Sequence, residues 1–114
     1  MIKVGLCDDI TDYNKKMENY IIRYGNENHI KVKITAYGSG SQLLLNFQKR
    51  KFDIIFLDVS MPELDGFETA ERIRSIDENV VIVFCTSFYT ISNAGKGFEV
   101  DAEAVSYTHL TLPT

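Results

Sequence analysis

The sequence predicts an α/β fold built on a doubly wound parallel sheet. Strand-like and helix-like segments alternate along the 114-residue chain. The segments between successive strands are long enough for the crossover connections that parallel pairing requires. Two strand-like segments, residues 52–57 and 80–85, are apolar without alternation, which is typical of strands that are covered on both faces of a sheet.

The first strand and the first helix come at the amino terminus. Residues 2–7 form a short apolar run, which indicates a strand. Residues 13–24 then place a stripe of apolar and aromatic side chains at helical spacing, so we expect one face of this helix to be buried. The stripe consists of Tyr13, Met17, Tyr20, Ile21 and Tyr24. Thr11 or Asp12 is a candidate N-cap, and Gly25 is expected to end the helix in a left-handed turn.

The next strand is expected at or near an edge of the sheet. Residues 31–36 alternate between polar and apolar side chains, which indicates a half-exposed strand. Residues 37–41 contain glycine and serine, so they break the chain and offer an N-cap for a helix that extends to Phe47. The apolar run 52–57 then predicts a central strand.

The remaining elements follow the same alternation. Gly66 opens a helix whose inward side chains are expected to be Phe67, Ala70 and Ile73. Residues 80–85 predict a second buried strand. A weaker helix is expected over residues 88–97, where two glycines lower the helix propensity. A last short strand is expected to begin near residues 98–100.

Composition and charge exclude several classes of protein. The chain is 45% apolar and 25% charged, as in ordinary globular domains, and we expect one domain over residues 1–102. A net charge of −4 gives no reason to expect direct DNA binding. The apolar runs are far shorter than the roughly 20 residues of a membrane helix. The amino terminus lacks a signal-peptide pattern, and Cys7 and Cys85 are expected to be buried thiols, so a cytoplasmic location is favoured.

Acidic residues follow two of the predicted strands at one edge of the sheet. Asp8 and Asp9 come directly after the first strand, Asp58 follows the third, and Thr86 follows the fourth. Ligands bind such sheets beyond the carboxyl ends of the strands. Neighbouring carboxylates repel one another unless a cation lies among them, and oxygen ligands of this kind suit Mg²⁺. The sequence therefore predicts a magnesium site that can meet an incoming phosphoryl group.

Three segments together resemble the response-regulator receiver family. They are Cys7-Asp8-Asp9, the run from Phe56 to Gly66 that reads L-D-V-S-M-P-E-L-D-G after its first residue, and Thr86-Ser87. The resemblance covers residues 1–102. It implies a flavodoxin-like (βα)5 fold with strand order 2-1-3-4-5, in which the last strand and helix of this chain are truncated or atypical.

The resemblance also implies roles for individual residues. Asp58 matches the aspartate that attacks phosphorus and forms an acyl phosphate. Asp9 and Asp58 match direct ligands of Mg²⁺, Asp8 acts through water, and Ser60 contributes its backbone carbonyl. Thr86 matches the hydroxyl residue that moves toward the phosphoryl oxygens and couples the chemistry to the opposite face. This division agrees with phosphoryl transfer in general, which needs mainly alignment and charge stabilisation.

The resemblance implies a signalling domain that catalyses only its own phosphoryl transfer and dephosphorylation, and is therefore not an enzyme in the ordinary sense. The expected phosphoryl donor is a sensor histidine kinase. Residues 86–89 and 97–102 look most like receivers attached to LytTR-type DNA-binding domains. This implies a transcription regulator that contacts DNA only through a domain outside these residues. A homodimer is compatible with the sequence, and no membrane contact is expected.

The carboxyl-terminal segment departs from the family. Receivers usually carry a Lys-Pro pair after the fifth strand, but here the lysine position falls near Thr108, the proline position near His109 and the aromatic switch position near Val105. No lysine occurs after Lys96. We hypothesise that residues 103–114 are a foreign or misread tail, and a native reading frame that encodes them would refute this. Loss of the last helix would uncover apolar sheet surface, so marginal stability or association is expected.

Other interpretations stay open beside the receiver. The acidic residues could serve only as helix caps and turn formers. A phosphatase of haloacid-dehalogenase type also uses an aspartyl phosphate, but it would require a second Asp two residues after the nucleophile, where this chain has Ser60. A phosphate-independent interaction module would keep the fold and lose the switch, and the missing lysine favours that alternative.

Overall fold

The computed structural model describes residues 1–86 and 103–106, and the side chains of residues 1–85. The helix expected over residues 88–97 and the strand start expected near residues 98–100 lie outside the described residues. Within the described part, strands and helices alternate as predicted.

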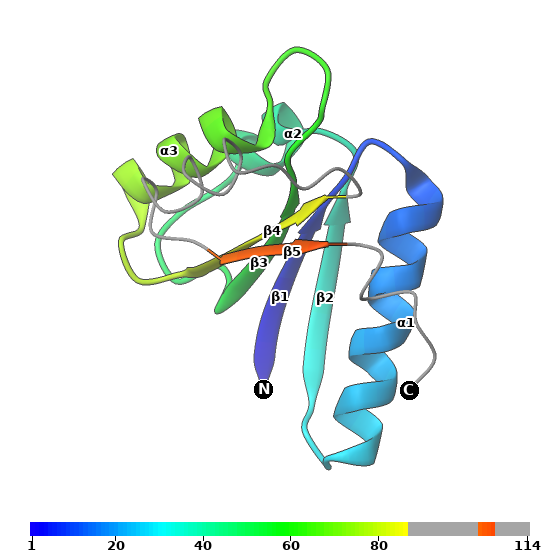
Figure 1. Cartoon of the computed structure of the whole chain (residues 1–114). Helices are drawn as coiled ribbons and strands as arrows, with labels where there is room; N and C mark the ends of the chain where they lie inside the picture. Colours follow the sequence, from blue (N-terminus) through cyan, green and yellow to red (C-terminus); the bar gives the residue numbers. More distant parts are fainter. Residues whose placement is uncertain (87–102, 107–114) are drawn as a thin grey trace.

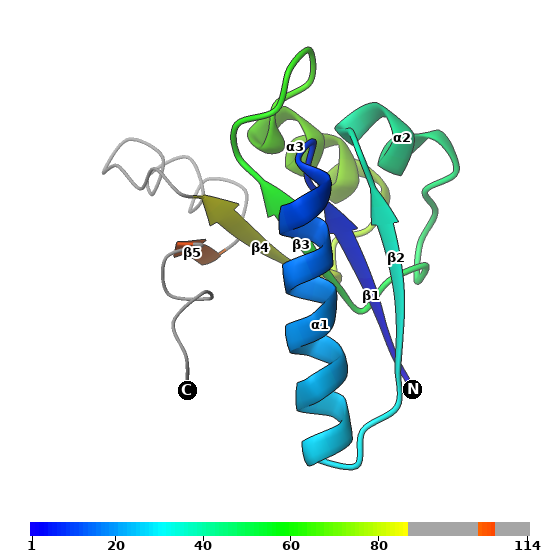
Figure 2. The same ribbon diagram turned by 90° about the vertical axis from the view of Figure 1, so that its right-hand side faces the viewer.

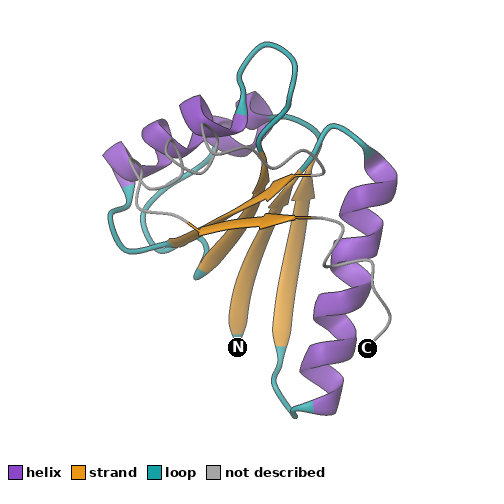
Figure 3. Cartoon of the chain, viewed as in Figure 1, coloured by secondary structure: helices purple, strands orange, loops and turns teal. Residues whose placement is uncertain are grey.

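The sheet has five parallel strands in the order β2-β1-β3-β4-β5 (Figures 1 and 3), which confirms the predicted order. Strand β2 lies at one edge, as its alternating sequence indicates, and β3 lies in the centre. The strands are β1 (Ile2–Cys7), β2 (Val32–Tyr37), β3 (Ile54–Asp58), β4 (Val81–Thr86) and β5 (Glu103–Ser106).

Helices cover both faces of this sheet, which makes it doubly wound (Figures 1 and 2). The described helices are α1 (Thr11–Glu27), α2 (Gly40–Leu45) and α3 (Gly66–Ile76). Helix α1 lies on one face, and α2 and α3 lie together on the other. In this described part of the chain, no helix is long and apolar enough to cross a membrane.

Each face of the sheet has its own apolar core. On the face of α2 and α3, the side chains of Leu43, Phe67 and Ile73 pack against buried residues of β3 and β4. The rings of Phe67 and Phe84 meet edge to face with their centroids 4.7 Å apart, a favoured aromatic arrangement. On the other face, Met17 of α1 packs against side chains of β1 and β4, including Val4, Leu6, Val83 and Cys85.

The amino terminus of α1 differs from the expected cap. Neither Thr11 nor Asp12 is the N-cap; this position is Ile10, whose side chain makes no capping hydrogen bond. The helix backbone begins with Tyr13 N–H donating to the Ile10 carbonyl at 3.0 Å. Two side chains outside the usual cap position, Asp8 and Asn14, bond to backbone groups here instead, and both belong to the surroundings of the site described below.

The carboxyl terminus of α1 also differs from the prediction, because the helix continues past Gly25 to Glu27. The left-handed residue is His29, with φ 56°, and Ile30 N–H donates to the Gly25 carbonyl at 2.8 Å, which is the pairing of a Schellman turn. A Cβ on Gly25 would lie 2.8 Å from the Ile30 carbonyl oxygen. Gly25 therefore permits a close approach of the chain that follows the helix.

One residue of the predicted apolar stripe is exposed. Tyr24 is 60% exposed, although it belongs to the predicted apolar stripe. The face that α1 buries at this end passes through Gly25, which is buried, and Ile21, which is half-buried. Helical spacing also makes Tyr24 a neighbour of Ile21, three residues earlier, so the spacing of the stripe did not distinguish the buried Gly25 from the exposed Tyr24.

Helices α2 and α3 begin as the sequence indicates. The Ser39 hydroxyl accepts a hydrogen bond from Gln42 N–H at 3.1 Å, and the Asp65 carboxylate accepts one from Glu68 N–H at 2.9 Å; both are side-chain N-caps. Helix α2 is shorter than predicted and ends at Leu45. Phe47 lies beyond the helix but is still buried.

Strand β5 lies in residues that the sequence assigned to the tail. Its four residues, Glu103–Ser106, pair in parallel with β4, with Thr86 opposite Ser106. The described last strand therefore lies later in the chain than residues 98–100. The hypothesis that residues 103–114 are foreign concerns the origin of the sequence, and it stays a prediction.

The amino-terminal ends of the strands are held by a buried carboxylate. Asp77, directly after α3, accepts backbone N–H bonds from Asn79 at 2.9 Å, Arg50 at 3.1 Å and Val80 at 3.2 Å. Burial opposes the charge, but these donors outweigh it and lower the pKa of Asp77. One side chain therefore links the end of α3 to the entry of β3 and of β4.

Gly66 provides a test of how closely the start of α3 packs against the end of β3. A Cβ at this position would lie 2.1 Å from the Asp58 carbonyl oxygen and 2.9 Å from Val59 Cα. We expect Gly66→Ala to lower the free energy of unfolding by about 2–3 kcal/mol, as overpacking does, although alanine favours helices. Gly38→Ala is the control, because its Cβ would meet only the flexible Gln42 side chain at 3.6 Å. Equal urea midpoints for the two variants would contradict this account.

Candidate functional site

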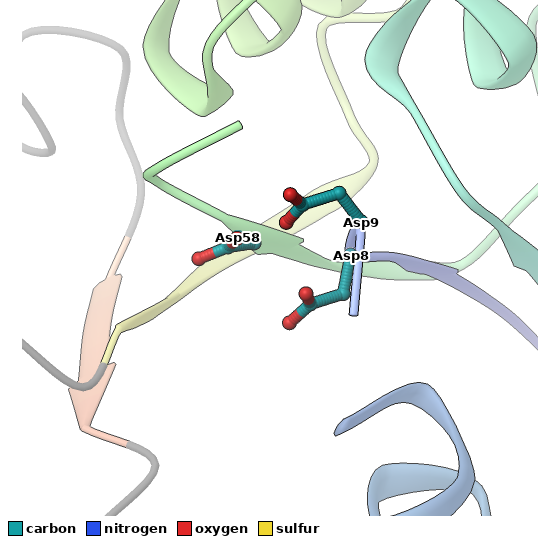
Figure 4. Close-up of side chains that lie close together, drawn as sticks. All are labelled: Asp8, Asp9 and Asp58. Atoms are coloured by element: carbon teal, nitrogen blue, oxygen red, sulfur yellow. The ribbon is translucent and has the colours of Figure 1, made fainter. Parts of the chain in front are cut away.

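Three carboxylates meet at the carboxyl-terminal edge of the sheet. Asp8 and Asp9 follow β1 directly, and Asp58 is the last residue of β3. Strands β1 and β3 are parallel neighbours, and Cys7 pairs with Leu57, so Asp8 and Asp58 follow at the same level. One oxygen from each of the three carboxylates lies within 4.8 Å of the others (Figure 4). We call Asp8, Asp9 and Asp58 the acidic cluster.

The members of the acidic cluster differ in exposure. Asp8 is 1% exposed and Asp58 is 7% exposed, whereas Asp9 is an exposed residue. The Asp8 carboxylate accepts a hydrogen bond from Ile10 N–H at 2.9 Å, and the Asp58 carboxylate accepts a longer one from Ser60 N–H at 3.4 Å. The cluster thus has a buried floor and an open side at Asp9.

The crowding of negative charge changes proton affinities in and beneath the cluster. Burial, with the charges of Asp8 and Asp9 adding to it, raises the pKa of Asp58 to about 7, and the Ser60 N–H only partly opposes this. Beneath the cluster, burial and the neighbouring carboxylates raise the pKa of the Cys7 thiol to about 12. Without a cation, Asp58 therefore holds a proton for part of the time at neutral pH.

The acidic cluster fits a hard divalent cation. Its donors are carboxylate oxygens, which Mg²⁺ prefers, and the exposed side at Asp9 leaves room for the water molecules that Mg²⁺ keeps. A cation would also remove the repulsion that raises the pKa of Asp58. The charge and the geometry of the donor set therefore agree with the magnesium site that the sequence predicts.

The loop after β3 is held by a turn of its own backbone and by contacts with β1 and β4. Val59 N–H donates to the Cys85 carbonyl at 3.3 Å, and Leu64 N–H donates to the Pro62 carbonyl at 2.8 Å around Glu63, whose φ is 66°. Met61 is buried under the cluster, with its sulfur 3.7 Å from the Cys7 sulfur. These contacts tie the loop to β1 and β4 and limit movement of the Asp58 main chain.

The structure places the remaining sequence-predicted residues only in part. Thr86 is the last residue of β4, beside β3, but its side chain lies outside the description. Ser60 contributes its N–H to Asp58, while the proposed ligand role of its carbonyl stays a prediction. Sequence reasoning missed Asn14, whose side chain bonds to the Asp8 carbonyl. An asparagine in a first helical turn carries no sequence signal that would have identified it.

The raised pKa of Asp58 predicts that Mg²⁺ binding depends on pH. At pH 6 the cation must displace a proton from Asp58, but at pH 8 it need not, because this pKa is about 7. The apparent Kd for Mg²⁺ is expected to fall roughly tenfold from pH 6 to pH 8, as measured by NMR titration of the backbone amides. An affinity independent of pH would contradict a cation that displaces a proton from Asp58 in this pH range.

In the absence of Mg²⁺, the free energy of unfolding should depend on pH through the titration of Asp58. A pKa raised in the folded state stabilises the fold at low pH, and this contribution is lost as pH rises through 7. The free energy of unfolding should therefore fall by about 2 kcal/mol between pH 5 and pH 8, less than the full shift would give because the cluster has an open side. Urea unfolding of Asp58→Asn, which cannot titrate there, should lack this loss.

Comparison with known proteins gives an independent result. The Response regulator receiver domain family model matches residues 4–106. The response regulator receiver protein CpdR of Brucella abortus is 31% identical over 107 residues, which are 93% of this chain and 84% of CpdR. The sensory transduction protein LytT of Oceanobacillus iheyensis is 36% identical over 66 residues, only 56% of this chain and 26% of LytT. The match to LytT is therefore too partial to support a LytTR assignment specifically.

Solved structures agree on the fold. The BeF3-activated receiver domain of DrrB from Thermotoga maritima aligns with a TM-score of 0.79 at 21% identity, and the alignment covers 93% of this chain and 84% of that one.

The chain spans less than half the length of the transcriptional regulators among its curated relatives. The family match over residues 4–106 shows that this chain belongs to the response regulator receiver domain family of two-component systems.

Proposed function

We propose that this chain is a phosphorylation-controlled switch in which Asp58 accepts a phosphoryl group from a sensor histidine kinase. The observation that carries the proposal is the meeting of Asp8, Asp9 and Asp58 at one edge of the sheet, with one oxygen from each within 4.8 Å. In the proposed cycle the acyl phosphate alters the surface near the site, and this change controls an output domain outside these residues.

Asp58 acts as the nucleophile in the proposed reaction. A carboxylate oxygen of Asp58 forms a bond to phosphorus while the bond between phosphorus and the donor's histidine nitrogen breaks, and the donor nitrogen keeps that electron pair. Transfer needs the deprotonated carboxylate, so an Asp58 that carries a proton at neutral pH must first release it to water, which a bound cation would favour. The Ser60 N–H, in the loop after β3, donates to the Asp58 carboxylate and so helps to orient it for attack.

The chain's own residues also define where the cation and the product charge would be held. Asp9 and Asp58 would bind Mg²⁺ directly, Asp8 through water, and Ser60 through its backbone carbonyl. When bound, Mg²⁺ neutralises negative charge on the phosphoryl oxygens and the carboxylates. Thr86 ends β4, the strand beside β3, and its hydroxyl would donate a hydrogen bond to the phosphoryl group and couple it to the opposite face.

The proposed function also includes an output domain that the receiver controls. Several curated relatives are transcriptional regulators longer than this chain, which supports a DNA-binding output domain, of LytTR type by the resemblance of residues 86–89 and 97–102. Phosphorylation would then act on DNA only through that domain. Residues 1–102 would form the receiver unit together with β5 (Glu103–Ser106), which pairs with β4, and a homodimer of receivers would be one form of output.

Acetyl phosphate with Mg²⁺ tests the proposal directly. The intact chain should gain one phosphoryl group by mass spectrometry, and Asp58→Asn should gain none. Asp9→Asn should label about a hundredfold more slowly, because a direct ligand is lost. Asp12→Asn is the matched control, since Asp12 is an exposed acid outside the cluster, and it should label at the normal rate.

Each alternative has its own outcome in this assay. Labelling that persists in Asp58→Asn would refute Asp58 as the acceptor. Complete absence of labelling would favour the phosphate-independent module, which the lack of lysine after Lys96 suggests. Rapid multiple turnover of a phosphomonoester would favour a phosphatase.

A further inference from the structure

The side chain of Asn14 links α1 to the carboxyl ends of two strands. Asn14 lies in the first turn of α1 and is half-buried. Its Nδ2 donates to the Asp8 carbonyl at 3.2 Å and to the Tyr37 carbonyl at 3.0 Å. One amide group therefore bonds to the main chain just after β1 and at the end of β2.

These bonds complete a set of restraints on Asp8. The backbone N–H of Asp8 donates to the Tyr37 carbonyl at 3.1 Å, the Asp8 carbonyl accepts from Asn14, and the Asp8 carboxylate accepts from Ile10 N–H. The peptide between Asp8 and Asp9 begins at the carbonyl that Asn14 holds. Since a peptide is planar and rigid, fixing this carbonyl also limits the direction in which Asp9 leaves the main chain.

We infer that Asn14 is a positioning residue for divalent-cation binding by Asp8 and Asp9. This inference rests on the proposed function. Mg²⁺ demands near-ideal octahedral geometry, whereas Ca²⁺ accepts irregular ligand arrangements. A restraint on the main chain that carries these two carboxylates should therefore matter more for Mg²⁺ than for Ca²⁺. Groups that orient metal ligands typically change metal affinity by about 10- to 100-fold when they are removed.

The other end of α1 provides a matched control for the chemistry of this bond. Asn28 Nδ2 donates to the Tyr24 carbonyl at 2.9 Å, so it is also an asparagine amide that bonds to a backbone carbonyl. It lies at the C-cap of the same helix, far along the chain from the acidic cluster. The general effect of losing one asparagine amide–carbonyl bond in α1 would be shared by Asn14 and Asn28, while a role in cation geometry belongs to Asn14.

The experiment compares Asn14→Ala and Asn28→Ala in the full chain, at a temperature where thermal unfolding shows both to be folded. NMR titrations give Kd for Mg²⁺ and for Ca²⁺. We expect Asn14→Ala to raise the Mg²⁺ Kd by about 10- to 100-fold and the Ca²⁺ Kd by only about two- to threefold. Asn28→Ala should leave both constants within about twofold of the wild type.

The outcomes separate this inference from the proposed function. An Mg²⁺ Kd within twofold of the wild type in Asn14→Ala would overturn the inference and leave the proposed function standing. Equal losses for Mg²⁺ and Ca²⁺ would overturn it too, because they would indicate general loosening of the site. If the wild-type chain binds no Mg²⁺ at all, the magnesium-dependent function fails and the inference fails with it.

Discussion

Repulsion among three carboxylates at one edge of the sheet is the constraint around which the functional end of this domain is organised. Parallel pairing of β1 with β3 brings Asp8 and Asp58 to the same level, and Asp9 follows in the chain. The fold supplies too little compensation, because the bond that Asp58 receives from Ser60 N–H is 3.4 Å long. The remaining negative charge is available to a cation and to the phosphoryl chemistry proposed for Asp58.

The opposite end of the sheet shows how the same residue type behaves when its charge is satisfied. Asp77 is also buried, but three backbone N–H groups donate to it and lower its pKa. Its role is to join chain segments, and it needs no ligand. Burial of an aspartate is therefore not in itself a sign of function; the number of donors around the carboxylate separates a structural acid from a reactive one.

Sequence reasoning succeeded where local patterns determine the structure. The meeting of the acids follows from where strands end, because parallel neighbours end at a common edge, whereas the sheet order came from the family resemblance. It failed where the role of a residue depends on backbone groups that the fold brings close to it. Gly25 was expected to end α1, yet its lack of a side chain serves an approach by the Ile30 carbonyl, and Asn14 gains its partners only when β1, β2 and α1 meet.

Family resemblance added roles that spacing alone cannot supply. Asp8 and Asp9 as a pair, or Asp58 before a proline-containing loop, would each be weak evidence, and only their combination identified the receiver. The structure in turn adds what the resemblance lacks, namely which groups hold each acid in place. Thr86 shows the limit of this gain, since its position at the end of β4 is defined while its side chain is not described.

Helix α3, together with Asp77 directly after it, contacts the main chain at both ends of the sheet. Its first residue lies against the Asp58 carbonyl, and Asp77, directly after its last turn, accepts hydrogen bonds from the backbone that precedes β3 and β4. The packing between Gly66 and the Asp58 carbonyl is too close to admit even a methyl group. A displacement of the Asp58 main chain toward α3 would therefore require Gly66 and the start of α3 to move with it.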